Sequence, residues 1–177
     1  MSLELEPLCW GAKVSPPFRD GVRRIGSRLG INPDYLMACM AFETGRTFDP
    51  AVRNKAGSGA TGLIQFMPST AAALGTSTNE LAKLSGPQQL IYVEAYFRPN
   101  KGRLKTLSDV YMAILWPGGI GRAEDYVLFR ESDKLHPKRY IQNAGLDFND
   151  DGVITKREAC DGPTRMFNIG LRPENVA

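Results

Sequence analysis

Gly62-Leu63-Ile64-Gln65-Phe66-Met67-Pro68 is the stretch of sequence that decides the fold. The residues before it, 45–62, are rich in Gly, Asn, Asp and Pro and predict a loop or a small irregular hairpin. After it, Pro68-Ser69-Thr70 is typical of the first turn of a helix. Upstream of the loop, Glu43 ends a strongly apolar segment, residues 37–42. The sequence therefore presents a helix-end carboxylate, a glycine-rich loop and this stretch in that order.

Capping residues and helix breakers predict that the chain is mainly helical. Ser15-Pro16-Pro17 is typical of an N-cap with first-turn prolines, and apolar residues then recur at helical spacing until Gly30. Asn32-Pro33 begins a second helix, and Gly45 ends it. The predicted helices cover about residues 16–29, 32–44, 68–75, 77–84, 85–98 and 106–115.

Length and composition fit a single domain with its own core. The chain has 177 residues, 42% of them hydrophobic, and no stretch is long and apolar enough to span a bilayer. Its formal charge is +3 and its pI is about 8.8, with the basic residues scattered along the sequence. This balance suits contact with an anionic polymer but does not resemble a nucleic-acid-binding surface. We expect a monomer that neither inserts into a membrane nor binds nucleic acid.

The cysteines and the N-terminal segment bear on where the chain acts. Cys9, Cys39 and Cys160 are an odd set without C-x-x-C spacing, and we expect free thiols. Free thiols indicate folding in a reducing compartment. Residues 1–15 lack the charged and apolar regions of a signal peptide. If the substrate lies outside the cytoplasm, another device must deliver the protein.

Glu43 is the strongest candidate for a catalytic group. Apolar neighbours destabilise the charged form of a carboxylate, so its pKa rises, and the C-terminal end of a helix dipole acts in the same direction. Such a glutamate holds a proton near neutral pH and can act as a general acid. Taken alone, a helix-end glutamate is more often simply solvated.

The motifs together resemble those of the lysozyme-like lytic transglycosylases, over about residues 30–130. The family pattern is Glu-Ser followed by Asn-x-x-Gly-Ala-x-Gly-Leu-Met-Gln-x-Met-Pro. It is matched by Phe42-Glu43-Thr44-Gly45, by residues 54–57 and by residues 62–68. The resemblance implies a mainly α, lysozyme-like domain of the goose-type and transglycosylase class over residues 1–140. Residues 141–177 are then a C-terminal segment packed on the same domain.

The resemblance also implies roles for individual residues. Glu43 matches the catalytic glutamate, and Thr44 keeps a hydroxyl where a serine usually stands. Gln65 matches the glutamine that contacts the N-acetyl sugar, and Met67 matches a methionine beside the cleft. Gly62 matches a glycine that lets the backbone approach the ligand, which its missing side chain permits. Phe66 is expected to pack in the core.

The sequence departs from the family where Ala-Tyr-Asn usually follows. Residues 111–121 instead form an apolar segment that runs into a Pro/Gly turn, as in phage-encoded members. Trp116 at this turn either stacks on a sugar ring or packs in the core. The family's catalytic glutamate accepts a hydrogen bond from a tyrosine; Tyr126 fits best by position, and Tyr140 is another candidate. Tyr96 is expected in the cleft wall or the core.

One carboxylate is enough for a lytic transglycosylase. Glu43 would protonate the glycosidic oxygen between MurNAc and GlcNAc, and would then take a proton from the C6 hydroxyl that closes a 1,6-anhydro sugar. A hydrolase normally uses two carboxyl groups. Asp49 is nearest in sequence, but Phe48-Asp49-Pro50 is typical of a turn. We therefore favour the transglycosylase; the alternatives are a hydrolytic muramidase and a non-catalytic calcium-binding virion protein.

Residues 147–158 fit the twelve-residue EF-hand calcium loop, with Gly152 at its sharp turn. The ligand positions are occupied by Asp147, Asn149, Asp151, Val153, Thr155 and Glu158. Because the chain has one such loop and the preceding segment is short, we expect a structural Ca²⁺ site rather than a sensor. Calcium would fix the C-terminal segment to the catalytic domain, and catalysis itself needs no cofactor.

The expected partner is the glycan strand of peptidoglycan in the bacterial cell wall. The phage-like turn and the lack of a signal peptide favour a phage lysis enzyme or a virion-associated enzyme, released through a holin or a secretion system.

Overall fold

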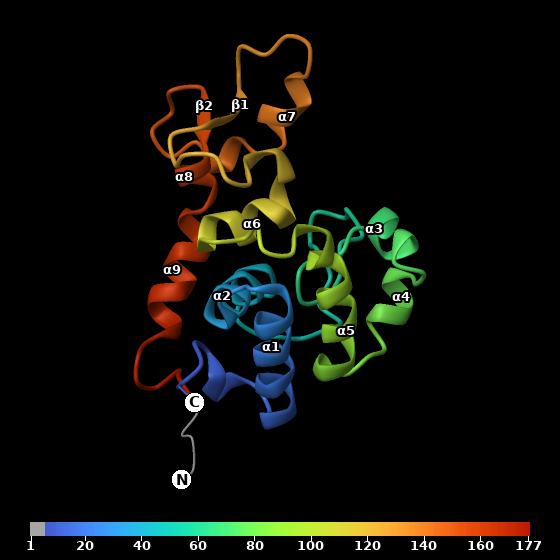
Figure 1. Ribbon diagram of the computed structural model, residues 1–177. Coiled ribbons are helices and arrows are strands. Elements are labelled where there is room, and N and C mark those ends of the chain that lie inside the picture. Colours follow the sequence, from blue (N-terminus) through green and yellow to red (C-terminus); the bar gives the residue numbers. More distant parts are fainter. Residues whose placement is uncertain (1–5) are drawn as a thin grey trace.

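The computed structural model describes residues 6–177 and is mainly helical, as predicted (Figure 1). The first five residues of the N-terminal segment considered for a signal peptide lie outside the described part. The helices are α1 (Pro16–Leu29), α2 (Pro33–Glu43), α3 (Pro68–Ala73), α4 (Thr78–Leu81), α5 (Gly86–Phe97), α6 (Leu107–Leu115), α7 (Pro137–Ile141), α8 (Lys156–Ala159) and α9 (Asp161–Gly170). The strands are β1 (Val127–Arg130) and β2 (Val153–Thr155), and short 3-10 turns cover Gly11–Lys13, Arg98–Asn100, Pro117–Gly119 and Ala144–Leu146.

The capping residues fix the helix boundaries that the sequence predicts. The Ser15 side chain accepts a hydrogen bond from the backbone of Phe18 at the start of α1, and Gly30 ends that helix in the left-handed conformation, with φ of 70°. Ser85 and Gln88 form a reciprocal capping box at α5. The α3 and α4 helices end earlier than predicted, because the chain after each one continues as hydrogen-bonded turns.

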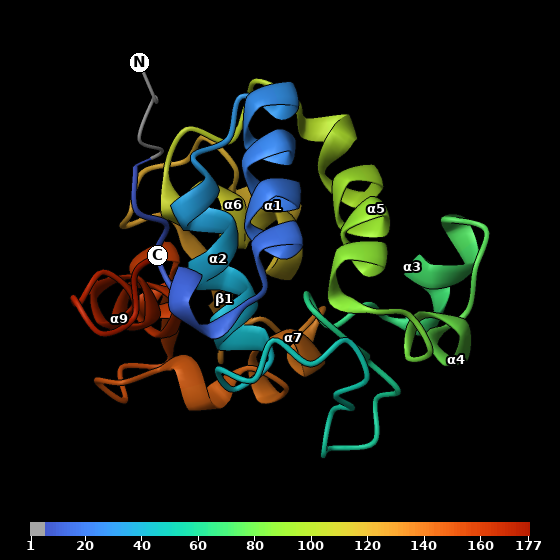
Figure 2. The same ribbon diagram turned by 90° about the horizontal axis from the view of Figure 1, so that it is seen from below.

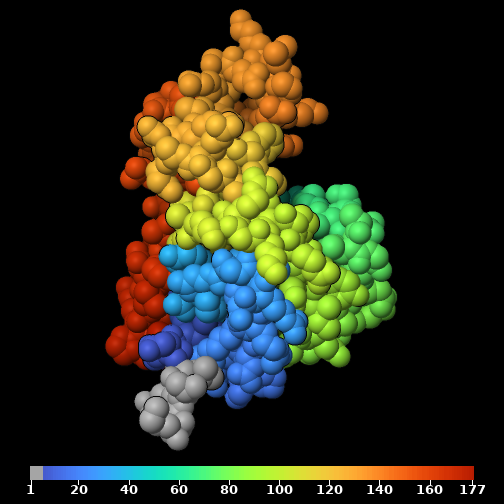
Figure 3. All heavy atoms as spheres, in the orientation of Figure 1, coloured from blue at the N-terminus to red at the C-terminus, as the bar shows by residue number. Residues whose placement is uncertain are grey.

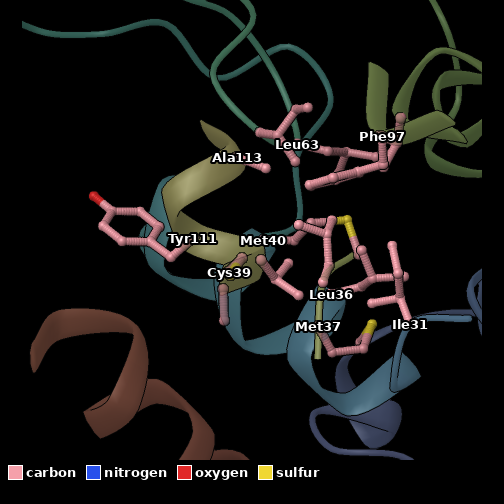
Figure 4. Packing of buried hydrophobic residues seen from close by; sticks show 14 of the residues in the cluster. Ile31, Leu36, Met37, Cys39, Met40, Leu63, Phe97, Tyr111 and Ala113 are labelled. Atoms are coloured by element: carbon pink, nitrogen blue, oxygen red, sulfur yellow. The ribbon is translucent and has the colours of Figure 1, made fainter. Parts of the chain in front are cut away.

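The α2 helix is the centre of the core. It packs against α1, α6 and α9, and its residues from Leu36 to Ala41 are all buried. Seen from below, α9 crosses beside α2, and α5 lies beside α1 (Figure 2). The close-up shows Leu36, Met37 and Met40 packed among side chains from other elements (Figure 4). A helix that is apolar on all sides needs neighbours on all sides, and this arrangement supplies them.

The C-terminal region wraps back onto this core. Strand β2 pairs antiparallel with β1, and Leu8 and Ala177 exchange backbone hydrogen bonds near the two ends of the described chain. The Trp10 indole donates a hydrogen bond to the Met166 carbonyl, at 2.9 Å. The space-filling view shows the segment between α6 and β2, coloured yellow to orange, as a lobe on the helical body (Figure 3). Helical periodicity did not predict three elements of this region, which are β1, α7 and α9 at residues 127–130, 137–141 and 161–170.

A buried ion pair fastens α8 to α6. The Nζ of Lys156 lies 2.7 Å from Oδ1 of Asp109, and both side chains are almost inaccessible to solvent. Lys156 also donates to the Arg122 carbonyl, and Asp109 accepts from the backbone of Gly121. Burial opposes ionisation of Asp109, but the Lys156 ammonium and the Gly121 N–H hold the pKa of the carboxyl below its ordinary value.

All three cysteines are free and buried, which confirms the prediction that they form no disulfide. Within residues 6–177, no helix is both long enough and apolar enough to cross a membrane.

Candidate active site

Glu43 is the last residue of α2 and lies where the helix meets the glycine-rich loop. Its side chain is partly exposed and forms no hydrogen bond or ion pair with any residue between 6 and 177. Burial raises the pKa of the Glu43 carboxyl from 4.5 to about 8. The carboxyl therefore carries a proton at neutral pH, and its oxygens are available to a ligand.

Two tyrosines lie within electrostatic reach of Glu43. Burial and the Glu43 charge both raise the pKa of the Tyr96 hydroxyl, which donates a hydrogen bond to the Ala113 carbonyl at 2.6 Å. The pKa of the Tyr111 hydroxyl is also raised, mainly by burial and secondly by the charge of Glu43. The Tyr111 ring stands edge-on to Phe42, with centroids 5.6 Å apart, and its hydroxyl points away from the apolar cluster (Figure 4). The sequence analysis did not single out Tyr111, because helical spacing alone marks it only as a core position.

A small pocket of about 50 Å³ opens beside Tyr96. Its lining brings together three residues that the sequence analysis assigned to the substrate, Gln65, Met67 and Tyr96. The complete lining is Ile64, Gln65, Phe66, Met67, Thr70, Tyr96 and Ile114. Met67 is 44% exposed, whereas Phe66 is 2% exposed and packs in the core as expected. Of these two adjacent residues, Met67 therefore faces solvent and Phe66 faces the core.

The stretch around Gln65 is a tight hairpin, in agreement with the predicted irregular loop. Thr61 and Phe66 exchange both backbone hydrogen bonds, and Arg53 pairs with Thr61 on the other side. The Gln65 backbone is left-handed, with φ of 52°. Its side-chain Nε2 donates to the carbonyls of Gly62 and Val52, at 3.1 and 3.3 Å. Internal bonds therefore occupy the amide nitrogen and leave the carbonyl oxygen for a ligand that donates a hydrogen bond.

A close contact within the protein requires glycine at position 62. A Cβ at position 62 would lie 2.3 Å from Oε1 of Gln89, and φ at Gly62 is +83°. Gln89 is completely buried; it accepts from the backbone of Leu63 and donates to the carbonyls of Pro50 and Leu81. The close approach is thus to Gln89, which ties the hairpin to α5. Sequence reasoning missed Gln89 because nothing local distinguishes it from Gln88.

Gly62→Ala is expected to reduce the free energy of unfolding by about 2–4 kcal/mol, because it strains the backbone and displaces a fully bonded buried amide. Gly57→Ala is the matched control: φ there is +79°, and no atom lies within 4 Å of the added Cβ. It should cost only about 1 kcal/mol. Urea unfolding of both variants measures the difference, and equal losses would show that Gln89 does not impose the glycine.

The substrate role expected for Thr44 is wrong. Its side chain is 3% exposed, and the hydroxyl donates to the Met40 carbonyl while accepting from the backbone of Phe48. Thr44 therefore shapes the chain as it leaves α2, and its buried hydroxyl is bonded within its own segment rather than exposed to a ligand. Asp49, the second acidic candidate, accepts from the backbone of Ala51 at 2.8 Å, and so forms the predicted turn.

The remaining aromatic candidates lie on the lobe side of α6. Trp116 caps the C-terminal end of α6; its ring meets Phe129 edge-on at 5.2 Å, and the Arg139 guanidinium lies over it at 5.1 Å. Tyr126 is 37% exposed, with Arg122 over its ring. The Tyr140 hydroxyl donates to Asp147 at 2.6 Å. Tyr140 is therefore engaged by the acidic loop rather than by Glu43, and no tyrosine hydroxyl in the described part of the chain donates to Glu43.

The acidic loop, residues 147–158, is closed by hydrogen bonds within itself. Gly152 is left-handed, with φ of 77°, and its N–H donates to Asp147 Oδ2. The carboxamide and carboxylate oxygens of Asn149 and Asp151 accept from backbone groups within the same turn. Glu158 caps α8 by accepting from the backbone and hydroxyl of Thr155. Within residues 6–177, no three acidic, His or Cys side chains are gathered as a metal site.

Comparison with known families places the catalytic half of the chain. The sequence model of the transglycosylase SLT domain matches residues 21–113, which run from α1 into α6. The match includes Glu43, the hairpin and Tyr96, and it ends before Trp116 and the acidic loop. No curated protein matches the chain. Because the family model matches more than half of the sequence and the fold is mainly helical, the chain belongs to the transglycosylase SLT family of peptidoglycan-cleaving enzymes.

Proposed function

We propose that the enzyme cleaves the β-1,4 bond between MurNAc and GlcNAc, with Glu43 acting first as general acid and then as general base. The observation that carries this proposal is a helix-end carboxyl with a pKa of about 8 and no protein partner among the described residues. Such a carboxyl is protonated in the resting enzyme and free to approach a glycosidic oxygen. The family match supports peptidoglycan as the substrate.

In the first step, Glu43 transfers its proton to the glycosidic oxygen, and the bond from that oxygen to C1 of MurNAc breaks with its electron pair leaving on GlcNAc. In the second step, the C6 hydroxyl oxygen of the same MurNAc attacks C1, and the hydroxyl proton passes to the Glu43 carboxylate. The products are a GlcNAc end and a 1,6-anhydro-MurNAc end, and Glu43 is again protonated. The sequence of steps consumes no water.

The electrostatics favour this one-carboxylate route over hydrolysis. Burial alone raises the pKa of Glu43, and no other carboxylate among the described residues contributes by charge repulsion. Asp49 is bound within its own turn. A retaining or inverting hydrolase would place a second carboxyl within about 5–10 Å of the first.

The pocket supports contacts to the sugar. Gln65 has a carbonyl oxygen free to accept from the N–H of an acetamido group, and its amide nitrogen is fixed by the hairpin. Met67 and Tyr96 supply apolar surface on either side of this pocket. Trp116 and Tyr126 extend the proposed contact surface toward the lobe, although an arginine lies over each ring.

Digestion of purified sacculi, followed by mass spectrometry of the products, tests the proposal. A transglycosylase releases muropeptides that are lighter by one water than the hydrolysis products. Reducing MurNAc ends alone would identify a hydrolytic muramidase. An absence of soluble products would favour the third alternative, a non-catalytic calcium-binding protein.

We further propose that the acidic loop binds one structural calcium ion. Asp147, Asn149, Asp151, the Val153 carbonyl, Thr155 and Glu158 supply hard oxygen atoms at the spacing that calcium prefers. The loop backbone already has the sharp turn that this spacing requires. Bound calcium would neutralise the clustered carboxylates and tie the lobe together, and it supplies no step of the reaction.

Glu158→Gln tests the calcium site cleanly, because glutamine also completes a capping box and so retains the start of α8. Without calcium, the variant should melt at about the same temperature as the wild type. At a hundredfold excess of calcium over Kd, the wild type should gain about 5–10 °C and the variant almost nothing. Differential scanning calorimetry measures both; a wild-type Tm that does not respond to calcium would count against the site.

We also propose a phage lysis or virion-associated origin, with delivery through a holin or a secretion system. The phage-like turn at Trp116-Pro117-Gly118-Gly119 and the reduced, buried cysteines support this route. Production in the bacterial cytoplasm should lyse cells only when a holin is produced as well; lysis without one would contradict the proposal.

A further inference from the structure

We infer that Arg139, held over Trp116 at the edge of the cleft, binds a carboxylate of the stem peptide carried by the glycan strand. This inference rests on the proposed function and names a specificity residue for the same reaction. Arg139 lies on α7, outside the segment that matches the family.

The position of Arg139 links the lobe to the cleft. Its guanidinium lies 5.1 Å from the centroid of the Trp116 ring. Trp116 stands two residues after Ile114, as the C-cap of α6, and Ile114 lines the pocket that contains Gln65. A glycan strand that leaves the pocket along α6 toward its C-terminal end would then reach Trp116 and the Arg139 guanidinium above it.

The charge of Arg139 is not neutralised within residues 6–177. Its side chain is exposed and takes part in no ion pair or side-chain hydrogen bond with these residues. The nearby Asp133 is engaged elsewhere, since it accepts from the backbone of Leu135 and His136. A guanidinium above an aromatic ring with no carboxylate partner has N–H groups free for a carboxylate, which it can bind in a bidentate manner.

Arg139 is also held in place. The hydroxyl of the next residue, Tyr140, donates to Asp147 Oδ2 at 2.6 Å, which joins α7 to the acidic loop. On its other side, Arg139 borders an open depression of about 410 Å³. The depression is lined by Leu135, His136, Pro137, Lys138 and Arg139, and Leu135 is 86% exposed. Apolar surface beside two cations complements a short peptide with small apolar side chains and free carboxylates.

The test compares two substrates made from the same glycan strands. One retains its stem peptides, and the other has been stripped of them by an amidase. Arg139→Met keeps the aliphatic stem that covers Trp116 but removes the charge. It should raise KM about tenfold on peptide-bearing strands, leave kcat unchanged, and have no effect on stripped strands. On peptide-bearing strands, the KM of Arg139→Lys should lie between those of the wild type and Arg139→Met, because lysine keeps a charge but lacks the planar guanidinium.

Arg122→Met is the matched control, because Arg122 also lies 5.1 Å above an aromatic ring, that of Tyr126. It should leave both KM values unchanged. Wild-type KM on peptide-bearing strands should also rise with salt, and Arg139→Met should remove this dependence. If the wild type cleaves neither substrate, the proposed function fails. If it cleaves both and Arg139→Met changes neither KM, or changes both equally, the role of Arg139 is refuted while the proposed function stands.

Discussion

Glu43→Gln is expected to lower the rate of glycan cleavage by about 10²- to 10⁴-fold, while the folded structure is retained. Glutamine has nearly the same shape as glutamic acid, but it neither delivers nor takes back a proton. Because the Glu43 carboxyl makes no hydrogen bond with the described residues, the substitution breaks no internal contact. The loss should therefore fall on kcat, with little change in KM. Release of soluble muropeptides from labelled sacculi measures it.

A matched control is available on α4. Glu80 is an exposed glutamate that pairs with Lys83 on the surface, and Glu80→Gln should retain full activity. Glu43→Asp keeps the carboxyl but withdraws it by one methylene, so it should also lose most of the activity. Clearing of cell walls by Glu43→Gln at the wild-type rate would exclude Glu43 as the catalyst.

The pH dependence of the wild type follows from the same carboxyl. The first step needs protonated Glu43, whose pKa burial raises to about 8. The value of kcat/KM should therefore be nearly constant below pH 8 and fall about tenfold per unit above it. A carboxyl with an ordinary pKa would instead lose activity from about pH 4.5 upward, so a profile over pH 4–10 separates the two cases.

The parts of this fold that the sequence predicts are those whose signals are local. Ser15 and Gly30 bound α1 through contacts within a few residues, and the Gly/Asn-rich run predicts the hairpin. Glu43 was identifiable because its apolar neighbours precede it in the same helix. In each case, the residues that decide the structure are close together in the chain.

The parts that escaped prediction depend on partners far away in the sequence. Gln89 reaches the hairpin across 26 residues, and Lys156 reaches Asp109 across 47. Thr44 occupies a position that in the family carries a serine, but the hydroxyl is used by its own helix and by Phe48. The resemblance marks the position, but it does not show how the hydroxyl is hydrogen-bonded. Only tertiary contacts show which polar groups are already satisfied and which, like Glu43, remain free.

Glu43→Gln is also expected to stabilise the folded protein at high pH, with an effect that disappears at low pH. The folded-state pKa of Glu43 is raised from 4.5 to about 8, so the folded state favours the protonated form. Below pH 4.5, the carboxyl is protonated in both the folded and the unfolded states, and the wild type bears no penalty. Between pH 4.5 and 8, the unfolded state ionises first, and stability is lost at up to about 1.4 kcal/mol per pH unit. Above pH 8, both states are ionised and the loss reaches its plateau.

A shift of this size corresponds to at most about 5 kcal/mol, and because Glu43 keeps some exposure to solvent we expect about 2–4 kcal/mol at pH 9. Glutamine does not ionise, so Glu43→Gln should exceed the wild type by this amount at pH 9 and match it closely at pH 4. Urea unfolding at pH 4, 6, 8 and 9 follows the difference, with Glu80→Gln as the control that should parallel the wild type. If the two curves for Glu43→Gln and the wild type ran parallel at all pH values, the carboxyl would not be desolvated in the free enzyme. The pH at which this loss of stability reaches its plateau should agree with the midpoint of the activity profile, because both report the folded-state pKa of Glu43.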